Sequence, residues 1–159
     1  MSFAVPFDGS RLAEAALVRA DEYARALDES VVAMSVVSTG PRYAVRKGWV
    51  DSREAFDVET VARGLWEQAR KLVPDAGFEY RLVGPRPPAG AVANTLRNML
   101  RSERPNVVFL GSDNAGRIAR PVSSVSSSVA AERAYDVYLV RDAKPSEIAA
   151  LDSHESFYD

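Results

Sequence analysis

The stretch Val107-Val108-Phe109-Leu110-Gly111-Ser112-Asp113-Asn114-Ala115-Gly116 decides the fold expected for this chain of 159 residues. Its first four residues are all apolar, which is typical of a strand covered on both faces of a parallel sheet. Gly111 ends this strand, and glycine allows another part of the backbone to approach closely. The serines of 123–128 then open a predicted helix, with Arg117 and Arg120 ahead of it. Because the N-terminus of a helix attracts anions, this pattern predicts a phosphate or nucleotide site.

Four other segments predict strands, and segments with apolar residues at helical spacing separate all five. The expected strands are 2–7, 31–37, 78–83, 107–110 and 136–141; the expected helices are 11–27, from 51 or 52 to 73, 92–100 and 123–133. This alternation predicts an α/β fold with a parallel sheet, right-handed crossovers and helices on both faces. A flavodoxin-like strand order, 2-1-3-4-5 or a close variant, places a ligand crevice at the carboxyl ends of the strands. Residues 78–83 alternate apolar and charged side chains, which favours a sheet edge.

The connection 38–50 contains proline, glycine and several basic residues, and it is predicted to be the longest irregular piece inside the domain. Such connections are often functional or mobile. Arg42, Arg46 and Lys47 are interpreted as solvated charges. Trp49 is interpreted as a packing anchor rather than as a platform on which a base stacks.

Composition limits the classes of function that the chain can have. The net charge of −2 and the pI of about 5.5 argue against general nucleic-acid binding, which needs a basic surface. There is no cysteine, no transmembrane-length apolar run and no signal-peptide pattern, so we expect a cytoplasmic protein without a membrane partner. We expect one domain over residues 1–142, followed by a polar tail over 143–159.

Several families of α/β proteins are not expected, because this chain lacks the residues that define them. A dinucleotide-binding unit needs Gly-x-Gly-x-x-Gly after its first strand, where this chain has Asp8-Gly9-Ser10-Arg11. Gly111 and Gly116 have the glycine spacing of a P-loop, but Arg117-Ile118 follows in place of Lys-Ser/Thr. The single histidine, His154, lies in the tail, so a serine-hydrolase triad is not expected. We predict no catalytic residue and no protein metal site.

Five short motifs, taken together and in order, resemble the universal stress protein family over residues 2–141. They are Val5-Pro6-Phe7-Asp8-Gly9-Ser10, Ser35-Val36-Val37, Val83-Gly84, Leu110-Gly111-Ser112, and Ser124-Val125-Ser126 ahead of Val137-Tyr138-Leu139-Val140. The resemblance implies a Rossmann-like three-layer sandwich with strand order 3-2-1-4-5. It also implies a regulatory protein that binds an adenine nucleotide, ATP with or without Mg²⁺, at the carboxyl ends of strands 1 and 4, with at most slow ATP hydrolysis.

The resemblance assigns Asp8 to the ribose or adenosine side, Val36 to adenine and Gly111 to the ribose or phosphates. The full predicted site consists of Pro6, Asp8, Val36, Leu110, Gly111, Gly116, Ser123, Ser124 and Val125, with Arg117 and Arg120 near the phosphates. For Asp8 the alternative is an Asx turn or a helix cap, and for the serines it is helix capping. For the two arginines the alternative is a solvated loop charge.

The loop of the ATP-binding members has the pattern Gly-x2-Gly-x9-Gly-Ser/Thr, and this chain departs from it. Asn114 and Ser123 stand at the second and third glycine positions, and the loop is one residue short. Asparagine adopts the left-handed conformation more easily than most residues, and Gly116 offers flexibility in a shifted register. An alternative function is therefore a homodimeric interaction module of the same fold that needs no nucleotide. A third is an enzyme that acts on another small ligand.

The prediction of a homodimer rests on the last predicted strand. Val137, Tyr138, Leu139 and Val140 are apolar on both faces of a strand expected at the sheet edge, and such an edge invites pairing with a second chain. The resemblance implies the same homodimer. The alternative is that the tail from Asp142 covers this edge.

Overall fold

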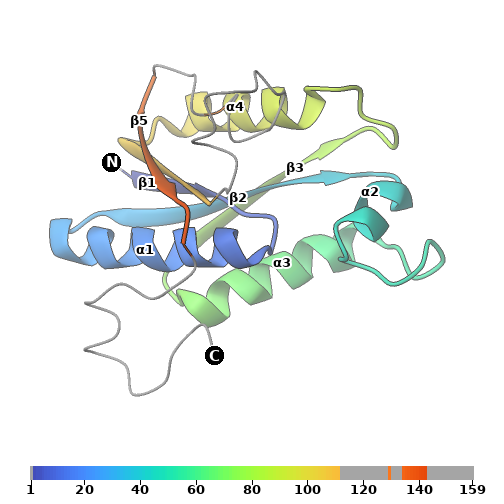
Figure 1. Cartoon of the computed structure of the whole chain (residues 1–159), viewed down its shortest axis with the longest axis horizontal. Helices are drawn as coiled ribbons and strands as arrows, with labels where there is room; N and C mark the ends of the chain where they lie inside the picture. Colours follow the sequence, from blue (N-terminus) through green and yellow to red (C-terminus); the bar gives the residue numbers. More distant parts are fainter. Residues whose placement is uncertain (1, 112–128, 130–133, 143–159) are drawn as a thin grey trace.

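A five-stranded parallel sheet organises the protein, seen in a computed structural model that describes residues 2–111, 129 and 134–142 (Figure 1). The strand order is β3-β2-β1-β4-β5, which confirms the order 3-2-1-4-5 and shows that the order 2-1-3-4-5 is wrong. The elements are β1(Ser2–Pro6), α1(Arg11–Leu27), β2(Ser30–Ser38), α2(Pro41–Arg46), α3(Val58–Leu72), β3(Gly77–Val83), α4(Ala91–Glu103), β4(Val107–Gly111) and β5(Asp136–Val140).

Helices cover both faces of the sheet, as the alternation of strands and helices predicts. Figure 1 shows α1 and α3 on one face and α4 on the other. Successive residues of a strand point to opposite faces, so Val31 and Ala33 join the core under α1 and α3, whereas Val32 and Met34 join the core under α4. Because β2 is buried on both faces, its nearly continuous apolar sequence is explained.

The two edges of the sheet differ. β3 is one edge, as its alternating sequence predicts, and most of its residues are exposed. β5 is the opposite edge; its residues from 137 to 139 are half-buried, and Val140 is buried. The Tyr138 ring stacks on Phe109 with centroids 5.0 Å apart, and Tyr23 of α1 lies 5.3 Å from the Tyr138 ring. β5 is therefore fixed to the domain by aromatic packing as well as by its pairing with β4.

Two predicted boundaries are wrong. The connection 38–50 is not irregular throughout, because it contains the six-residue helix α2, which has Pro41 in its first turn. Proline is well suited to a first turn, where no N–H partner is needed. α3 begins at Val58 rather than near 51 or 52, since Asp57 caps it through a 3.2 Å bond from the Thr60 N–H to its Oδ2.

Two further predictions, the full helix at 123–133 and the tail at 143–159, lie largely or wholly outside the described residues. Val129, which is described, is helical and buried, and its carbonyl oxygen accepts a 2.9 Å hydrogen bond from the Tyr135 hydroxyl. Within the part of the chain that the structure describes, no helix has the length and apolar character needed to cross a membrane.

Candidate functional site

The turn between β1 and α1 forms the centre of the candidate site. Asp8 Oδ1 accepts a 3.0 Å hydrogen bond from the Ser10 N–H, which is an Asx turn. Ser10 Oγ in turn accepts a 3.3 Å bond from the Ala13 N–H and caps α1. Gly9 has φ +78°, a left-handed conformation that favours glycine. The Asx turn that was the alternative role for Asp8 is therefore present, and it uses the Oδ1 atom of the carboxylate.

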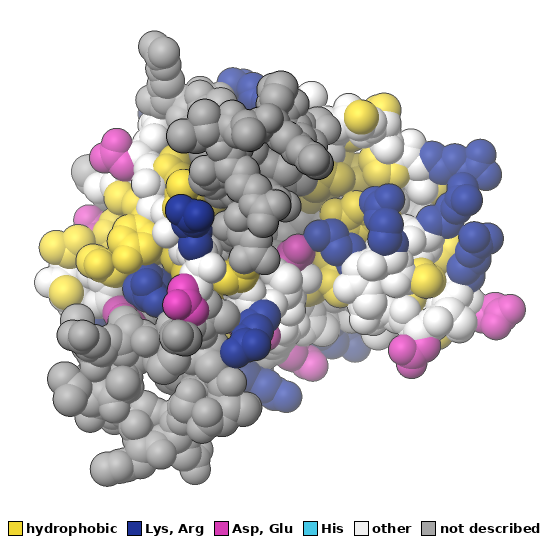
Figure 2. Space-filling view, viewed as in Figure 1, with side chains coloured by type: hydrophobic (Ala, Val, Ile, Leu, Met, Phe, Trp, Pro, Cys, Tyr) yellow, Lys and Arg dark blue, Asp and Glu magenta, His cyan; other side chains and the backbone are white. Residues whose placement is uncertain are grey.

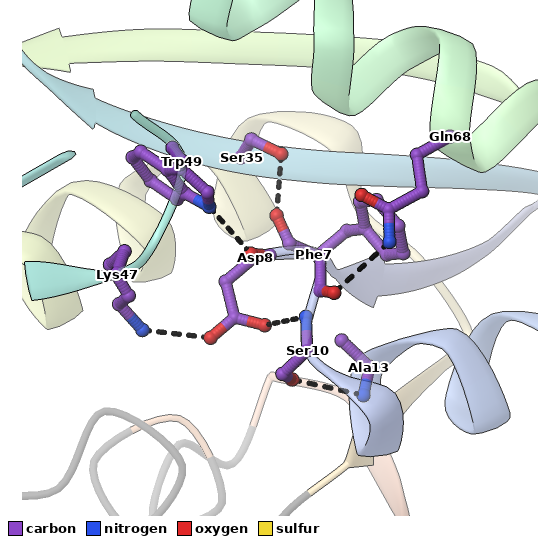
Figure 3. A network of polar contacts seen from close by, with 9 residues as sticks. Phe7, Asp8, Ser10, Ala13, Ser35, Lys47, Trp49 and Gln68 are labelled. Atoms are coloured by element: carbon purple, nitrogen blue, oxygen red, sulfur yellow. Dashed lines mark hydrogen bonds and ion pairs between the residues drawn. The ribbon is translucent and has the colours of Figure 1, made fainter. Parts of the chain in front are cut away.

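Three successive carbonyl groups of this turn accept hydrogen bonds from side chains of three other segments (Figure 3). The carbonyl oxygens of Phe7, Asp8 and Gly9 accept, in that order, from Ser35 Oγ, from Trp49 Nε1 at 2.8 Å and from Gln68 Nε2 at 3.0 Å. β2, the segment after α2, and α3 thus all hold the turn in place. The buried carbonyl of Phe7 and the partly buried carbonyls of Asp8 and Gly9 thus have partners within the protein.

Lys47 forms an ion pair with Asp8, an arrangement that the sequence analysis missed. Lys47 Nζ donates to Asp8 Oδ2 at 2.7 Å, and about a third of each side chain is exposed, 33% for Lys47 and 37% for Asp8. Arg42, Arg46 and Lys47 are all exposed, as predicted, but Lys47 also has a partner that the interpretation as a solvated charge did not include. Trp49 is a half-buried packing residue, as predicted, and also a hydrogen-bond donor.

The ion pair sets the ionisation of both groups. Burial raises the pKa of the Asp8 carboxyl, but hydrogen bonds from Lys47 and Ser10 and the charge of Lys47 outweigh it, so the pKa lies below its ordinary value of 3.8. Burial lowers the pKa of the Lys47 ammonium, but the hydrogen bond and charge of Asp8 outweigh it, so the pKa lies above 10.5. Both groups are therefore charged at neutral pH.

A pocket of about 100 Å³ lies at the carboxyl ends of β1, β2 and β4. It brings together the five predicted site residues that the structure describes, namely Pro6, Asp8, Val36, Leu110 and Gly111. Seven further residues line it that the predicted site lacks: Phe7, Ala13, Met34, Tyr43, Lys47, Val92 and Leu96. The remaining predicted residues, Gly116, Arg117, Arg120, Ser123, Ser124 and Val125, lie outside the described residues.

The sequence contains a signal for some of the seven pocket residues that the predicted site lacks. The basic connection that contains Tyr43 and Lys47 follows the second strand directly, and the carboxyl ends of neighbouring parallel strands meet at one edge of a sheet. Val92 and Leu96 were recognised as the apolar face of a helix. This face also closes a pocket because of the position at which α4 crosses the sheet. The periodicity of the sequence does not predict that position.

Gly111 has a packing role that is independent of any ligand. A β-carbon built at Gly111 would lie 2.1 Å from the carbonyl oxygen of Leu12 and 2.3 Å from its carbonyl carbon. These are backbone atoms of α1, so they cannot move aside as a flexible side chain would. The end of β4 therefore passes α1 at a distance that only glycine permits.

The described side chains do not form a recognisable metal centre. Among residues 2–111, 129 and 134–142, no group of three or more His, Asp or Glu side chains is placed to hold a metal ion. The carboxylate at the pocket, Asp8, is already paired with Lys47. What the described site offers to a ligand is an apolar wall with one carboxylate and one ammonium group at its rim.

Comparison with known proteins assigns the chain to a family. The universal stress protein family matches residues 1–141, so the chain belongs to that family. A solved universal stress protein in complex with cAMP is 19% identical, has a TM-score of 0.56 and is matched over 88% of this chain and 96% of that one.

Two further solved structures show the same fold. The universal stress protein UspA from Lactobacillus plantarum is 18% identical, with a TM-score of 0.53 and coverage of 89% of this chain and 97% of that one. A universal stress protein family member from Burkholderia pseudomallei is also 18% identical, with a TM-score of 0.52 and coverage of 88% and 95%. The search of curated proteins found no match.

Proposed function

We propose that this universal stress protein family member is a regulatory protein that binds an adenine nucleotide at the carboxyl ends of β1 and β4. One observation carries the proposal. Pro6, Asp8, Val36, Leu110 and Gly111, which the family resemblance selects from three separate strand ends, line a single pocket. The solved family member that contains cAMP supports the choice of an adenine ligand.

The pocket suits a planar ring on one side and a polar group on the other. Val36, Leu110 and Leu96 offer apolar contacts for a base. The volume of about 100 Å³ is below the roughly 300–1,000 Å³ of sites that enclose a whole ligand, so the sugar and phosphates would lie outside it. Asp8 and Lys47 stand at this boundary, where a carboxylate can accept from a ribose hydroxyl and an ammonium group can pair with a phosphate.

The charge near the pocket favours an anionic ligand. Figure 2 shows Lys and Arg side chains gathered at the end of the molecule that carries α2 and the loop between β3 and α4. This local excess exists although the whole chain has a net charge of −2. ATP, with or without Mg²⁺, and cAMP are therefore the ligands to test first. Gly116, Ser123, Ser124 and Val125, with Arg117 and Arg120, remain the proposed phosphate-side residues.

Isothermal titration calorimetry and thermal-shift titration with ATP and cAMP test this proposal, with GTP as the comparison for the base. We expect saturable binding that Val36→Leu weakens, because the longer side chain narrows the ring-sized pocket. Leu27→Phe is the control, since Leu27 lies at the end of α1, is 61% exposed and does not line the pocket. Protein that binds neither ATP nor cAMP at millimolar concentration would show the proposal to be wrong.

A second candidate function is a homodimeric interaction module that needs no nucleotide. It is favoured by the fact that Asp8 and Gly111 both have complete structural roles without a ligand. The proposed dimer pairs β5, through Val137, Tyr138, Leu139 and Val140, with the same strand of a second copy. Light scattering tests this dimer, and a monomer at micromolar concentration would exclude it. A dimer that binds no adenine nucleotide is the result that selects this candidate over the first.

A further inference from the structure

A second and larger hollow lies on the other side of the Asp8–Lys47 ion pair. It is an open groove of about 550 Å³ between α3 and the segment 46–50, with the β1–α1 turn at its floor. Its volume falls in the range of about 300–1,000 Å³ that small-molecule sites occupy. The pocket proposed for the nucleotide does not include α3, so the two hollows share only the ion pair as a common wall.

The groove has an excess of positive charge. Arg46 and Lys47 line it together with one carboxylate, that of Asp8. Since Lys47 is paired with Asp8 at 2.7 Å, Arg46 supplies the net charge. Arg46 is an exposed residue that lines the groove, and its guanidinium lies 5.1 Å from the centre of the Tyr43 ring, which belongs to the smaller pocket. Thr60 and Val61, in the first turn of the fifteen-residue helix α3, line the opposite wall, at the positive end of the helix dipole.

The groove also has apolar walls. The half-buried Trp49 and Val50 line one side, and the buried Val61 and Leu65 line the other. Cationic groups beside an indole ring and aliphatic side chains suit a molecule that has both an anionic group and an apolar ring. An indole at this position is an efficient contact surface, because it is rigid and also carries a polar N–H group.

Gly64 leaves open space along the α3 side of this groove, because it has no side chain. It lies in the interior of α3, where glycine is less favourable than alanine. A β-carbon built there would meet no atom within 4 Å, and Gly64 is not among the glycines with positive φ. Neither packing nor backbone conformation therefore requires this glycine. Its effect on the structure is to leave space in the wall that faces Trp49.

We propose that this groove binds a small aromatic anion, an aryl phosphate or aryl carboxylate, with the anionic group at Arg46 and the ring between Trp49 and Gly64. This site is separate from the proposed nucleotide pocket except for the Asp8–Lys47 wall that the two hollows share, and the proposal stands whether or not that pocket binds a nucleotide. The charge excess selects the anion, the apolar walls select the ring, and the glycine supplies the room for it.

Two-dimensional NMR of the indole N–H groups tests the proposal, with phenyl phosphate as the probe and benzyl alcohol as its neutral analogue. The chain has two tryptophans, and Trp66→Phe assigns the remaining indole signal to Trp49. We expect phenyl phosphate to shift the Trp49 signal in a saturable way and benzyl alcohol to bind about tenfold more weakly. Equal binding of the two compounds, or no shift of the Trp49 signal at millimolar phenyl phosphate, would overturn the proposal.

Variants locate the binding site. Gly64→Leu should weaken phenyl phosphate about tenfold by filling the groove, and Arg46→Gln should weaken it several-fold by removing the charge. Gly64→Ala is expected to fold at least as stably as the parent protein and to weaken binding by a smaller factor. Glu67→Leu is the matched control, since it adds a leucine to an exposed position of α3 that does not line the groove.

Val36→Leu separates this site from the proposed nucleotide pocket. We expect it to leave phenyl phosphate binding unchanged, because Val36 lines only the smaller pocket. If Val36→Leu weakens phenyl phosphate and the Gly64 variants do not, the anion binds in the nucleotide pocket and the groove is not its site.

Discussion

Lys47 Nζ lies 2.7 Å from Asp8 Oδ2, and this ion pair joins the carboxyl end of β1 to the end of α2. The two side chains line both the small pocket above β1, β2 and β4 and the groove beside α3. The pair is partly exposed, so solvent screens it and its contribution to stability is modest. Its position matters more than its strength, because any ligand that recruits either group changes a wall of both hollows.

Replacement of Lys47 measures that contribution. We expect Lys47→Met to lower the free energy of unfolding by up to about 1 kcal/mol at low salt and by less at high salt, since salt screens a partly exposed pair. Urea unfolding at two salt concentrations measures the effect, with Lys71→Met on exposed α3 surface as the control. A double-mutant cycle with Asp8→Asn that shows no coupling would contradict this prediction.

The pKa shifts of the pair predict how its contribution depends on pH. The folded pKa of Asp8 is lowered, so its contribution is present above the ordinary value of 3.8 and is lost as the pH falls through the lower folded value. The folded pKa of Lys47 is raised, so its contribution is present below 10.5 and is lost as the pH rises through the higher folded value. The stability difference between the parent protein and Lys47→Met should therefore be constant across neutral pH. A difference that changes steeply near pH 7 would argue against this assignment.

Two glycines should respond to alanine in opposite directions. Gly111→Ala places a β-carbon against the backbone of Leu12, so we expect it to lower the free energy of unfolding by about 3 kcal/mol or more, or to prevent folding. Gly64→Ala meets no neighbour and should raise it by about 1 kcal/mol, because alanine favours the helix. Urea unfolding of both variants measures the contrast. Equal effects would show that α1 and β4 can move apart to admit a side chain.

Ser35 should contribute to the position of the Asp8 turn. Its hydroxyl, buried in β2, donates to the Phe7 carbonyl, and Ser35→Ala leaves that buried acceptor without this partner. We expect a loss of about 1–3 kcal/mol in the free energy of unfolding. Thr39→Ala is the control, because Thr39 follows the same strand and its side chain is exposed. An equal effect of the two substitutions in thermal or urea unfolding would contradict the prediction.

Apolar patterning accounts for most of what the sequence predicted correctly about the fold. Runs of apolar residues identified β1, β2, β4 and β5, and alternation identified β3 as an edge. The family resemblance then selected the strand order. The start of α3 was misplaced because Asp51, Ser52 and Asp57 are all suitable N-caps, and only tertiary packing decides among them.

The predicted residues of the described site lie at strand ends, whereas most of the missed ones come from helices or from the segment after α2; Phe7 and Met34, on the first two strands or directly after them, were missed as well. The ends of the parallel strands pointed to Asp8 and Gly111, and the family resemblance added Pro6, Val36 and Leu110. Lys47 reaches Asp8 only because α2 ends where it does, and a six-residue helix leaves almost no periodic signal in a sequence. Spatial pairs of this kind need a structure.

The contact between Gly111 and Leu12 bears on how such sequences are compared. A glycine that the crossing of α1 and β4 demands would remain in a descendant that had lost every ligand, because its replacement would first disrupt the domain. In this chain the architecture alone accounts for Gly111, so its presence says little about which ligand the protein binds.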